Sequence, residues 1–217
     1  MEKNNEISIS VIKRLPRYYR FLENLKNNGI QKISSKELAN RMGLTASQVR
    51  HDFNCFGGFG QQGYGYNVPD LYQKIGDILC VDKKVKTILI GAGNLGKAVS
   101  WKLSTRANGF ELIGIFDKNE AICGKMVHGV PVRHINTLEN FCIDNSPVCA
   151  VICIPSSDMK ELTKTLVKLG ITSFWNFTNY DIAMEYPEVL VENVHLTDSI
   201  MTLSYLTSNN DDNINND

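Results

Sequence analysis

The sequence predicts an α/β protein in which a doubly wound parallel sheet follows a small helical domain and precedes a terminal helix. Two observations carry this prediction. An apolar run over residues 86–90 leads directly into a glycine-rich turn and a helical repeat. From there, strand-like apolar runs alternate with helical patterns as far as residue 194, and alternating units of this kind build parallel sheets with helices on both faces.

The N-terminal region contains three helical patterns. Apolar residues recur with a helical period over residues 7–25, and because Pro16 lies within that pattern, we expect the helix to begin near it. Asn28-Gly29 marks its end. Two capping boxes follow, Ser34-Ser35-Lys36-Glu37 and Thr45-Ala46-Ser47-Gln48, and each opens a short helix. Two short helices joined by a brief break form a helix–turn–helix pattern.

The second short helix carries polar side chains on one face. Val49 and Phe53 lie four residues apart, so we expect both to face the core. The polar residues that remain on the open face are Ser47, Gln48, Arg50, His51 and Asn54. Side chains of these types reach base edges and phosphates from the major groove of DNA. The alternative is an ordinary solvated helix face.

A glycine-aromatic segment over residues 56–68 follows that helix. We expect a β-hairpin, or wing, with Gln61 and Gln62 near its tip, where they contact the minor groove or the backbone of DNA. Charge favours the same partner, because residues 1–84 contain 13 Lys and Arg against 8 Asp and Glu, whereas residues 85–217 contain 10 against 15. The alternative is chance, since the excess is modest.

The turn after the first strand reads Gly91-Ala92-Gly93-Asn94-Leu95-Gly96, a pattern typical of dinucleotide-binding sites. In such a turn Gly91 permits the tight bend, Gly93 lets the backbone approach a pyrophosphate, and Gly96 lets helix and strand pack closely. The N–H groups at the helix start then face an anion. A tight turn with a purely structural role is the alternative.

An acidic residue follows at the spacing that such a site requires. The strand over residues 110–116 leads to Asp117, 21 residues after Gly96, where a ribose-binding acid is expected. A carboxylate there accepts hydrogen bonds from the ribose hydroxyls and repels a 2′-phosphate, which favours NAD over NADP. Ligands lie beyond the carboxyl ends of parallel strands, which places Pro155 and Asn176 beside the far end of the cofactor. Both positions fit ordinary strand-to-helix turns equally well.

Apolar residues cover most of the helical pattern over residues 196–206, a stripe too broad for burial on one side only. We expect this helix to insert into a partner subunit, which predicts a homodimer. Docking of the helix on its own domain is the alternative. Residues 208–217 are polar, and we expect them to form a disordered tail.

The cysteines lack the spacing of a zinc site, so we expect no metal and six free thiols. They are Cys55, Cys80, Cys123, Cys142, Cys149 and Cys153. Free thiols are typical of a cytoplasmic protein, and a thiol switch is the alternative. The sequence contains neither a signal-peptide pattern nor an apolar run of membrane-spanning length.

Together, these motifs resemble those of the Rex family of redox-sensing transcriptional repressors over residues 12–206. The most specific pieces are Arg14-Leu15-Pro16-Arg17-Tyr18-Tyr19-Arg20, Gln48-Val49-Arg50, residues 56–68, residues 91–96 and Val191-Glu192-Asn193-Val194. The resemblance implies a winged-helix DNA-binding domain over residues 1–84, a Rossmann NAD(H)-binding domain over residues 85–195, and a helix over residues 196–207 that is exchanged between the subunits of a homodimer. It also implies that NADH releases the protein from a double-stranded DNA operator, whereas NAD⁺ permits binding.

The chain departs from the family pattern at residues that link nucleotide to DNA. The recognition helix reads Arg50-His51-Asp52 in place of the family's Arg-Lys-Asp. The family's switch network of Arg, Tyr and Asp corresponds to Arg20, Lys102 and His195. Since Arg20 cannot form a charge-assisted pair with Lys102 or His195, we expect NADH to shift operator affinity less than in a typical member.

Two other functions are alternatives. One is a DNA-binding paralogue that responds weakly or not at all to NAD(H). The other is an NAD-dependent oxidoreductase, which needs a proton-transfer residue at the nicotinamide. The histidines of the C-terminal half, His128, His134 and His195, do not end predicted parallel strands beside an acidic residue. We therefore expect the protein not to be an enzyme.

Overall fold

The computed structural model describes residues 7–59, 64–105 and 109–214 of the 217-residue chain, with side chains in the last helix described as far as residue 208. The chain divides into two compact units, Met1–Asp82 and Lys83–Asp217. The division falls two residues before the expected boundary at residue 84. Each unit has hydrophobic clusters of its own.

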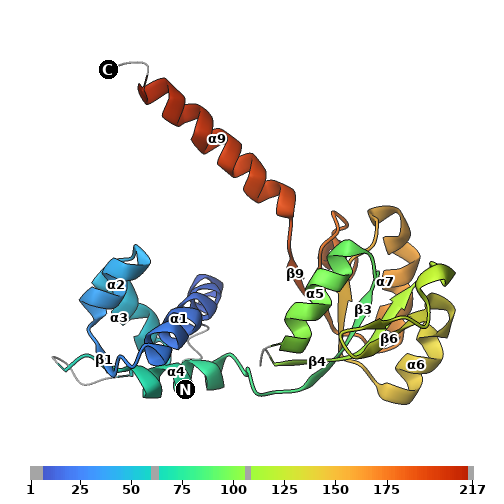
Figure 1. Ribbon diagram of the computed structural model, residues 1–217, viewed down its shortest axis with the longest axis horizontal. Helices are drawn as coiled ribbons and strands as arrows, with labels where there is room; N and C mark the ends of the chain where they lie inside the picture. Colours follow the sequence, from blue (N-terminus) through green and yellow to red (C-terminus); the bar gives the residue numbers. More distant parts are fainter. Residues whose placement is uncertain (1–6, 60–63, 106–108, 215–217) are drawn as a thin grey trace. The chain divides into compact units, whose positions relative to one another are not determined.

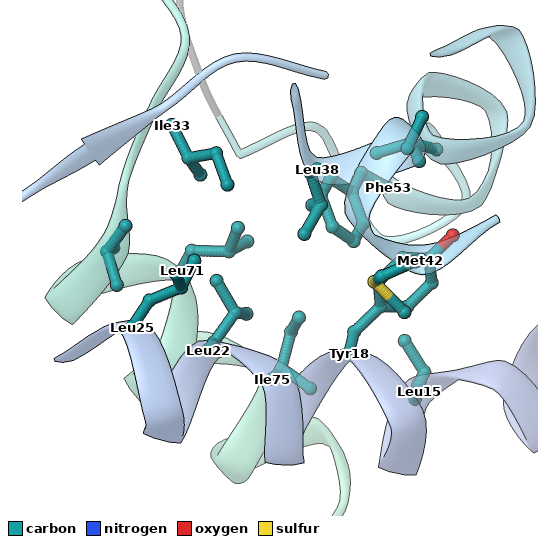
Figure 2. Packing of buried hydrophobic residues seen from close by; sticks show 13 residues of the cluster. Leu15, Tyr18, Leu22, Leu25, Ile33, Leu38, Met42, Phe53, Leu71 and Ile75 are labelled. Carbon is teal, nitrogen blue, oxygen red and sulfur yellow. The ribbon is translucent and has the colours of Figure 1, made fainter. Parts of the chain in front are cut away.

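The described part of the first unit packs its helices around one core. These helices are α1 (Ile9–Asn27), α2 (Ser35–Met42), α3 (Ala46–Asn54) and α4 (Val68–Ile78). Figure 2 shows Leu15, Tyr18 and Leu22 of α1 on the same side of that helix, facing the core that includes Leu38 and Phe53. Burial of these side chains joins α1 to the two short helices.

The expected capping residues Ser34 and Thr45 cap the starts of α2 and α3, while the side chains of Glu37 and Gln48 bond to Arg41 and Asp52 instead. Ser34 Oγ accepts a hydrogen bond from the Glu37 N–H at 3.0 Å, and Thr45 Oγ1 accepts one from the Gln48 N–H at 3.1 Å. Gly43 ends α2 in the left-handed region with φ of 65°. These contacts confirm the helix–turn–helix prediction.

Helix α1 runs through Pro16, so the expectation that it begins near this residue is wrong. A proline inside a helix removes one backbone hydrogen bond and costs about 3 kcal/mol. Pro16 is exposed, while Val11 and Leu15 before it are buried. Burial of each of these two side chains stabilises the fold by roughly 1.5–3 kcal/mol, which offsets the proline.

The glycine-aromatic segment does not form the expected self-contained hairpin in its described part. Strand β2 (Tyr66–Asn67) instead pairs antiparallel with β1 (Lys32–Ile33), a strand that was not predicted. Gly57 and Gly58 have φ of 91° and 76°, which turns the chain away from an extended strand directly after α3. Residues 60–63 lie outside the described residues.

The second unit is built on a seven-stranded sheet with the order β5-β6-β4-β3-β7-β8-β9. Every pairing is parallel except that of β5 with β6, which confirms the doubly wound prediction. The strands are β3 (Val85–Ile90), β4 (Phe110–Asp117), β5 (Met126–Val127), β6 (Val130–His134), β7 (Cys149–Ile152), β8 (Ser173–Asn176) and β9 (Leu190–Asn193).

Helices cover both faces of this sheet (Figure 1). Successive side chains of a strand point to opposite faces. Ile88 and Ile90 of β3 pack in one cluster with residues of α6 (Leu138–Asn145) and α7 (Met159–Lys168). Leu89 packs in another cluster with residues of α5 (Asn94–Thr105). The continuous apolar pattern of β3 reflects this burial on both sides.

The last helix, α9 (Leu196–Ile214), is longer than expected, as Figure 1 shows. The expectation of a disordered tail from residue 208 is therefore wrong as far as residue 214. The segment contains neither glycine nor proline to end the helix. The short helix α8 (Ile182–Glu185) and strand β5 were not predicted, because a single helical turn and a two-residue strand leave no periodic pattern.

Candidate functional site

The glycine turn lies where the sheet reverses its strand order. Strand β3 has β4 on one side and β7 on the other. Helix α5, which follows β3, packs on one face, and α7, which follows β7, packs on the opposite face. In doubly wound sheets, ligands bind in the crevice at this switch point, outside the carboxyl ends of the strands. Residues 91–96 occupy that position.

Two glycines of the turn are required by the protein's own packing. Gly91 has φ of 97°, and a Cβ there would lie 2.4 Å from the carbonyl oxygen of Cys153. A Cβ at Gly96 would lie 1.8 Å from the carbonyl oxygen of Gly91. Both approaches are too close for any side chain. The roles expected for Gly91 and Gly96, in the tight bend and in close helix–strand packing, are thus present.

Gly93 is different, because the protein itself has no need of a glycine there. Its φ lies outside the left-handed region, and a Cβ would meet no atom within 4 Å. Gly93, Asn94 and Leu95 are exposed at the start of α5, while Ala92 is buried. An exposed glycine before a helix N-terminus leaves room for an anion to approach the backbone N–H groups. This turn therefore fits a pyrophosphate.

Asp117 is fixed beside the glycine turn. Its Oδ2 accepts a hydrogen bond from the Ala92 N–H at 2.7 Å, and its Oδ1 accepts one from the Asn119 N–H at 2.8 Å. Each carboxylate oxygen can accept a second hydrogen bond. The remaining acceptor sites are available to the hydroxyls of a ribose, and this role of Asp117 stays a prediction.

The two residues expected at the far end of the cofactor differ in their surroundings. Pro155 is exposed and follows β7, where a ligand can reach it. The prediction is wrong for the side chain of Asn176, which is fully buried and bonded within the protein. Its Nδ2 donates to the Tyr180 carbonyl and to Asn193 Oδ1, both at 2.9 Å, and its Oδ1 accepts from Thr178. These bonds join β8 to β9 and leave the amide unavailable to a ligand.

His134 ends the parallel strand β6, contrary to the sequence-based expectation, and its register partner on β4 is Asp117. Its Nδ1 accepts a hydrogen bond from the Asn136 N–H at 3.3 Å, so the imidazole caps the following turn. Strand β6 lies beyond β4, on the side of the sheet that holds Asp117. A nicotinamide is expected on the opposite side of β3, so His134 is not placed to exchange a proton with it.

Helix α3 has the two faces that the sequence predicted. Val49 and Phe53 are buried, whereas the exposed residues are Ser47, Arg50, His51 and Asn54. Arg50 Nη1 donates to Ser35 Oγ at 3.2 Å. Gln48 is half-buried, and its amide donates to Asp52, which turns it away from the open face. Gln61 and Gln62 lie outside the described residues.

Asp52 is a functional candidate that the sequence reasoning missed. Its carboxylate is fully buried and accepts two hydrogen bonds from Arg14 at 2.7 Å, one from Tyr18 at 2.9 Å and one from Gln48 at 2.9 Å. Burial alone would raise the pKa of Asp52, but these hydrogen bonds outweigh it and lower the pKa. The cluster joins α1 to α3. The spacing of Asp52 along the helix could have revealed this role. Asp52 is three residues from Val49 and next to Phe53, so it lies on the side of α3 that faces the core.

Comparison with known proteins bears on both units. Residues 6–54 match the family described as "Putative DNA-binding protein N-terminus", and residues 82–180 match the family described as "CoA binding domain". The redox-sensing transcriptional repressor Rex of Clostridium perfringens is 46% identical over 211 residues, covering 97% of this chain and 99% of that protein. The chain belongs to the Rex family. Rex of Caldanaerobacter subterraneus subsp. tengcongensis is 48% identical, covering 94% of this chain and 91% of its own.

Solved Rex structures share the fold. The crystal structure of RSP, a Rex-family repressor, matches with a TM-score of 0.85 at 43% identity, covering 96% of this chain and 97% of that one. RSP in complex with β-NAD⁺ and operator DNA matches with a TM-score of 0.87 at 45% identity, covering 96% and 95%. RSP in complex with β-NADH matches with a TM-score of 0.86 at 42% identity, covering 96% and 97%.

The residues expected to form the Rex switch network are all exposed. Arg20 lies on α1 in the first unit, and Lys102 lies on α5 in the second. His195 precedes α9, and its Nδ1 lies 3.3 Å from a carboxylate oxygen of Asp198. The three exposed side chains are accessible to a binding partner. Their role in switching stays a prediction.

Helix α9 presents the apolar stripe expected of a Rex dimerisation helix. All its described side chains, as far as residue 208, are exposed. The large apolar ones, each at least half exposed, are Leu196, Ile200, Met201, Leu203, Tyr205 and Leu206. Monomeric proteins rarely leave a continuous apolar surface of this kind in water. The alternative of docking on its own domain receives no support.

The six cysteines are free thiols, as expected. Burial raises the pKa of Cys149 to about 11 and that of Cys153 to about 12, so both are protonated at neutral pH. Among the described residues, no group of three or more His, Cys, Asp or Glu side chains is placed to hold a metal ion. In the same part of the chain, no helix is both long enough and apolar enough to cross a lipid bilayer.

Proposed function

We propose that this Rex protein is a transcriptional repressor that binds operator DNA through its first unit and senses the NADH/NAD⁺ ratio through its second. NADH releases it from the operator, and NAD⁺ permits binding. The observation that carries the proposal is Gly93, a glycine that the protein's packing does not require, at the switch point of the sheet. The RSP complexes with NAD⁺ and operator DNA and with NADH support the same assignment.

Different residues of the chain bind different parts of the nucleotide. The backbone N–H groups of residues 93–95, at the start of α5, hold the pyrophosphate, with Gly91 and Gly96 shaping the turn. Asp117 accepts from the adenosine ribose, and Pro155 borders the nicotinamide half. When bound, the nucleotide supplies a change of charge and planarity in its nicotinamide ring. The protein reads that change and transfers no hydride, so it acts as a sensor and not as an enzyme.

DNA recognition falls to α3. Ser47, Arg50, His51 and Asn54 line its exposed face and suit contacts in a major groove. We expect Gln61 and Gln62, which lie outside the described residues, to add contacts to the minor groove or the backbone of DNA. Asp52 positions α3 by anchoring it to Arg14 of α1. A homodimer joined through α9 presents two such helices to a two-fold operator in the cytoplasm.

Operator titration tests this function. Duplexes are first selected from a random library with the unmodified protein, and the selected duplex is then titrated at fixed salt with NADH, with NAD⁺ and with neither. We expect tight binding with NAD⁺ or without nucleotide, and weaker binding with NADH. Failure to select any duplex, or equal affinity with NADH and NAD⁺, would contradict the proposal. The size of the NADH effect also measures the consequence of Lys102 and His195.

A further inference from the structure

We propose that Lys118 and Asp158 form a clasp across the nucleotide site at the carboxyl end of β3, and that Asp158, by holding Lys118 beside the ribose acid Asp117, strengthens selection of NADH over NADPH. The inference rests on the proposed binding of NAD(H) to the second unit. It adds two residues to that site that the glycine pattern and the ribose acid do not include.

The clasp joins the two strands that flank β3. Lys118 directly follows Asp117 at the end of β4, and Asp158 ends the single turn Ser156–Asp158 that follows β7. Since β4 and β7 both neighbour β3, their ends are separated by two strand spacings, about 10 Å. Lys118 Nζ nevertheless lies 2.6 Å from Asp158 Oδ2. The ion pair therefore spans the carboxyl end of β3, from which the glycine turn begins.

Asp158 has few partners that compete with Lys118. The turn Ser156–Asp158 runs directly into α7, and the Asp158 side chain accepts no hydrogen bond from the first turn of that helix. Besides Lys118 it accepts one hydrogen bond from Ser157 Oγ, at 3.3 Å. Hydrogen bonding between the two residues raises the pKa of Lys118 and lowers that of Asp158. Their side chains are 73% and 37% exposed, so water screens the pair and opening it requires little energy.

The position of Lys118 gives the clasp its chemical consequence. A carboxylate at the ribose position repels the 2′-phosphate of NADPH, whereas a cation beside it accommodates that phosphate. Asp117 is such a carboxylate, and Lys118 next to it is such a cation. In the ion pair, Asp158 neutralises the ammonium group and holds it across the site. Loss of the Asp158 charge would release Lys118 to the 2′-phosphate.

The test compares dissociation constants for NADH and NADPH, measured by nicotinamide fluorescence at fixed salt. Asp158→Asn should bind NADPH about tenfold more tightly, the equivalent of one charge-assisted hydrogen bond, with little change for NADH. Lys118→Met should not gain NADPH affinity, and combining it with Asp158→Asn should remove the gain. Glu161→Gln is the matched control, because it removes an exposed acid from the first turn of the same helix. Asp158→Ser repeats the test if Asp158→Asn misfolds.

The outcomes separate this inference from the function on which it rests. If the unmodified protein binds neither NADH nor NAD⁺, the proposed function is wrong and the inference falls with it. If NADH binds but Asp158→Asn keeps the unmodified ratio of NADH to NADPH affinity, only the clasp is rejected. A gain that persists in the double variant, or that Glu161→Gln reproduces, also rejects it, because Lys118 would not be the group responsible.

Discussion

Gly93 and Gly96 lie three residues apart in the same turn, and their surroundings are opposite. A Cβ at Gly93 meets no atom within 4 Å, whereas one at Gly96 would lie 1.8 Å from the Gly91 carbonyl oxygen. Gly93 therefore leaves open space at the protein surface, whereas Gly96 permits close packing within the protein. Substitution at the two positions should separate ligand binding from folding.

We expect Gly93→Val to fold normally and to lose NADH binding, because the new side chain occupies the space needed by the pyrophosphate. Gly96→Ala should instead lower the free energy of unfolding by more than the roughly 1–3 kcal/mol of ordinary overpacking, because the new Cβ meets a backbone oxygen that cannot easily move. Calorimetric titration measures the first effect and thermal melting the second. An unchanged dissociation constant in folded Gly93→Val would reject the pyrophosphate position.

Asp52 makes the first unit sensitive to acid. Its pKa is lowered in the folded protein, so its charged form stabilises the fold above its unfolded pKa of about 3.9. That contribution is lost as pH falls below this value through the lowered pKa. We expect Asp52→Asn to flatten the pH dependence of unfolding below about pH 4. Asp52→Ala leaves the buried Tyr18 hydroxyl unpaired and should cost about 1–3 kcal/mol at neutral pH. Denaturant unfolding from pH 2 to 7 checks both, and identical pH profiles would contradict the assignment.

At the scale of elements, α3 and α9 each expose a face that the rest of the described chain does not cover. The face of α3 is polar and that of α9 is apolar. The polar face of α3 suits DNA, and a second copy of the chain is the partner proposed for the apolar face of α9.

Arg50→Ala should weaken binding to the selected duplex by about 1–3 kcal/mol if the guanidinium contacts a guanine. If it contacts a phosphate, the loss should be similar on all duplexes and the salt dependence should become shallower. Lys164→Ala, an exposed charge change on α7 in the second unit, is the control. Titration at several salt concentrations distinguishes these cases. Unchanged affinity of Arg50→Ala for every duplex would remove α3 from the interface.

Truncation after His195 should convert the proposed dimer into monomers or aggregates, because it removes the apolar stripe of α9. Leu203→Asp in the full chain tests the same surface without removing the helix, and Ser204→Asp is the matched control on an adjacent exposed residue. Sedimentation velocity gives the oligomeric state of each variant. A truncated protein that sediments as a well-folded dimer would show that another surface joins the subunits.

For the molecule as a whole, sequence patterns were sufficient where many residues carry one signal. The strands around β3 and the capped helices α2 and α3 were predicted because burial and capping leave periodic or local marks. Single contacts were not predictable. Asn176 ends a strand as a ligand-binding residue would, but its buried amide bonds to Asn193, 17 residues away, and no local pattern reveals that pairing. Pro16 lies inside a helix, where proline is normally unfavourable, because the packing of Val11 and Leu15 in the core outweighs its cost.

The division into two units has a thermodynamic consequence. Each hydrophobic cluster draws its buried residues from one unit, so we expect each unit to unfold cooperatively on its own. Differential scanning calorimetry should then resolve two transitions. A ligand that binds only native protein stabilises the unit that holds it, so NADH should raise one melting temperature and a short operator duplex the other. The transition whose melting temperature rises thus identifies the unit to which a small molecule binds, without an assay of repression.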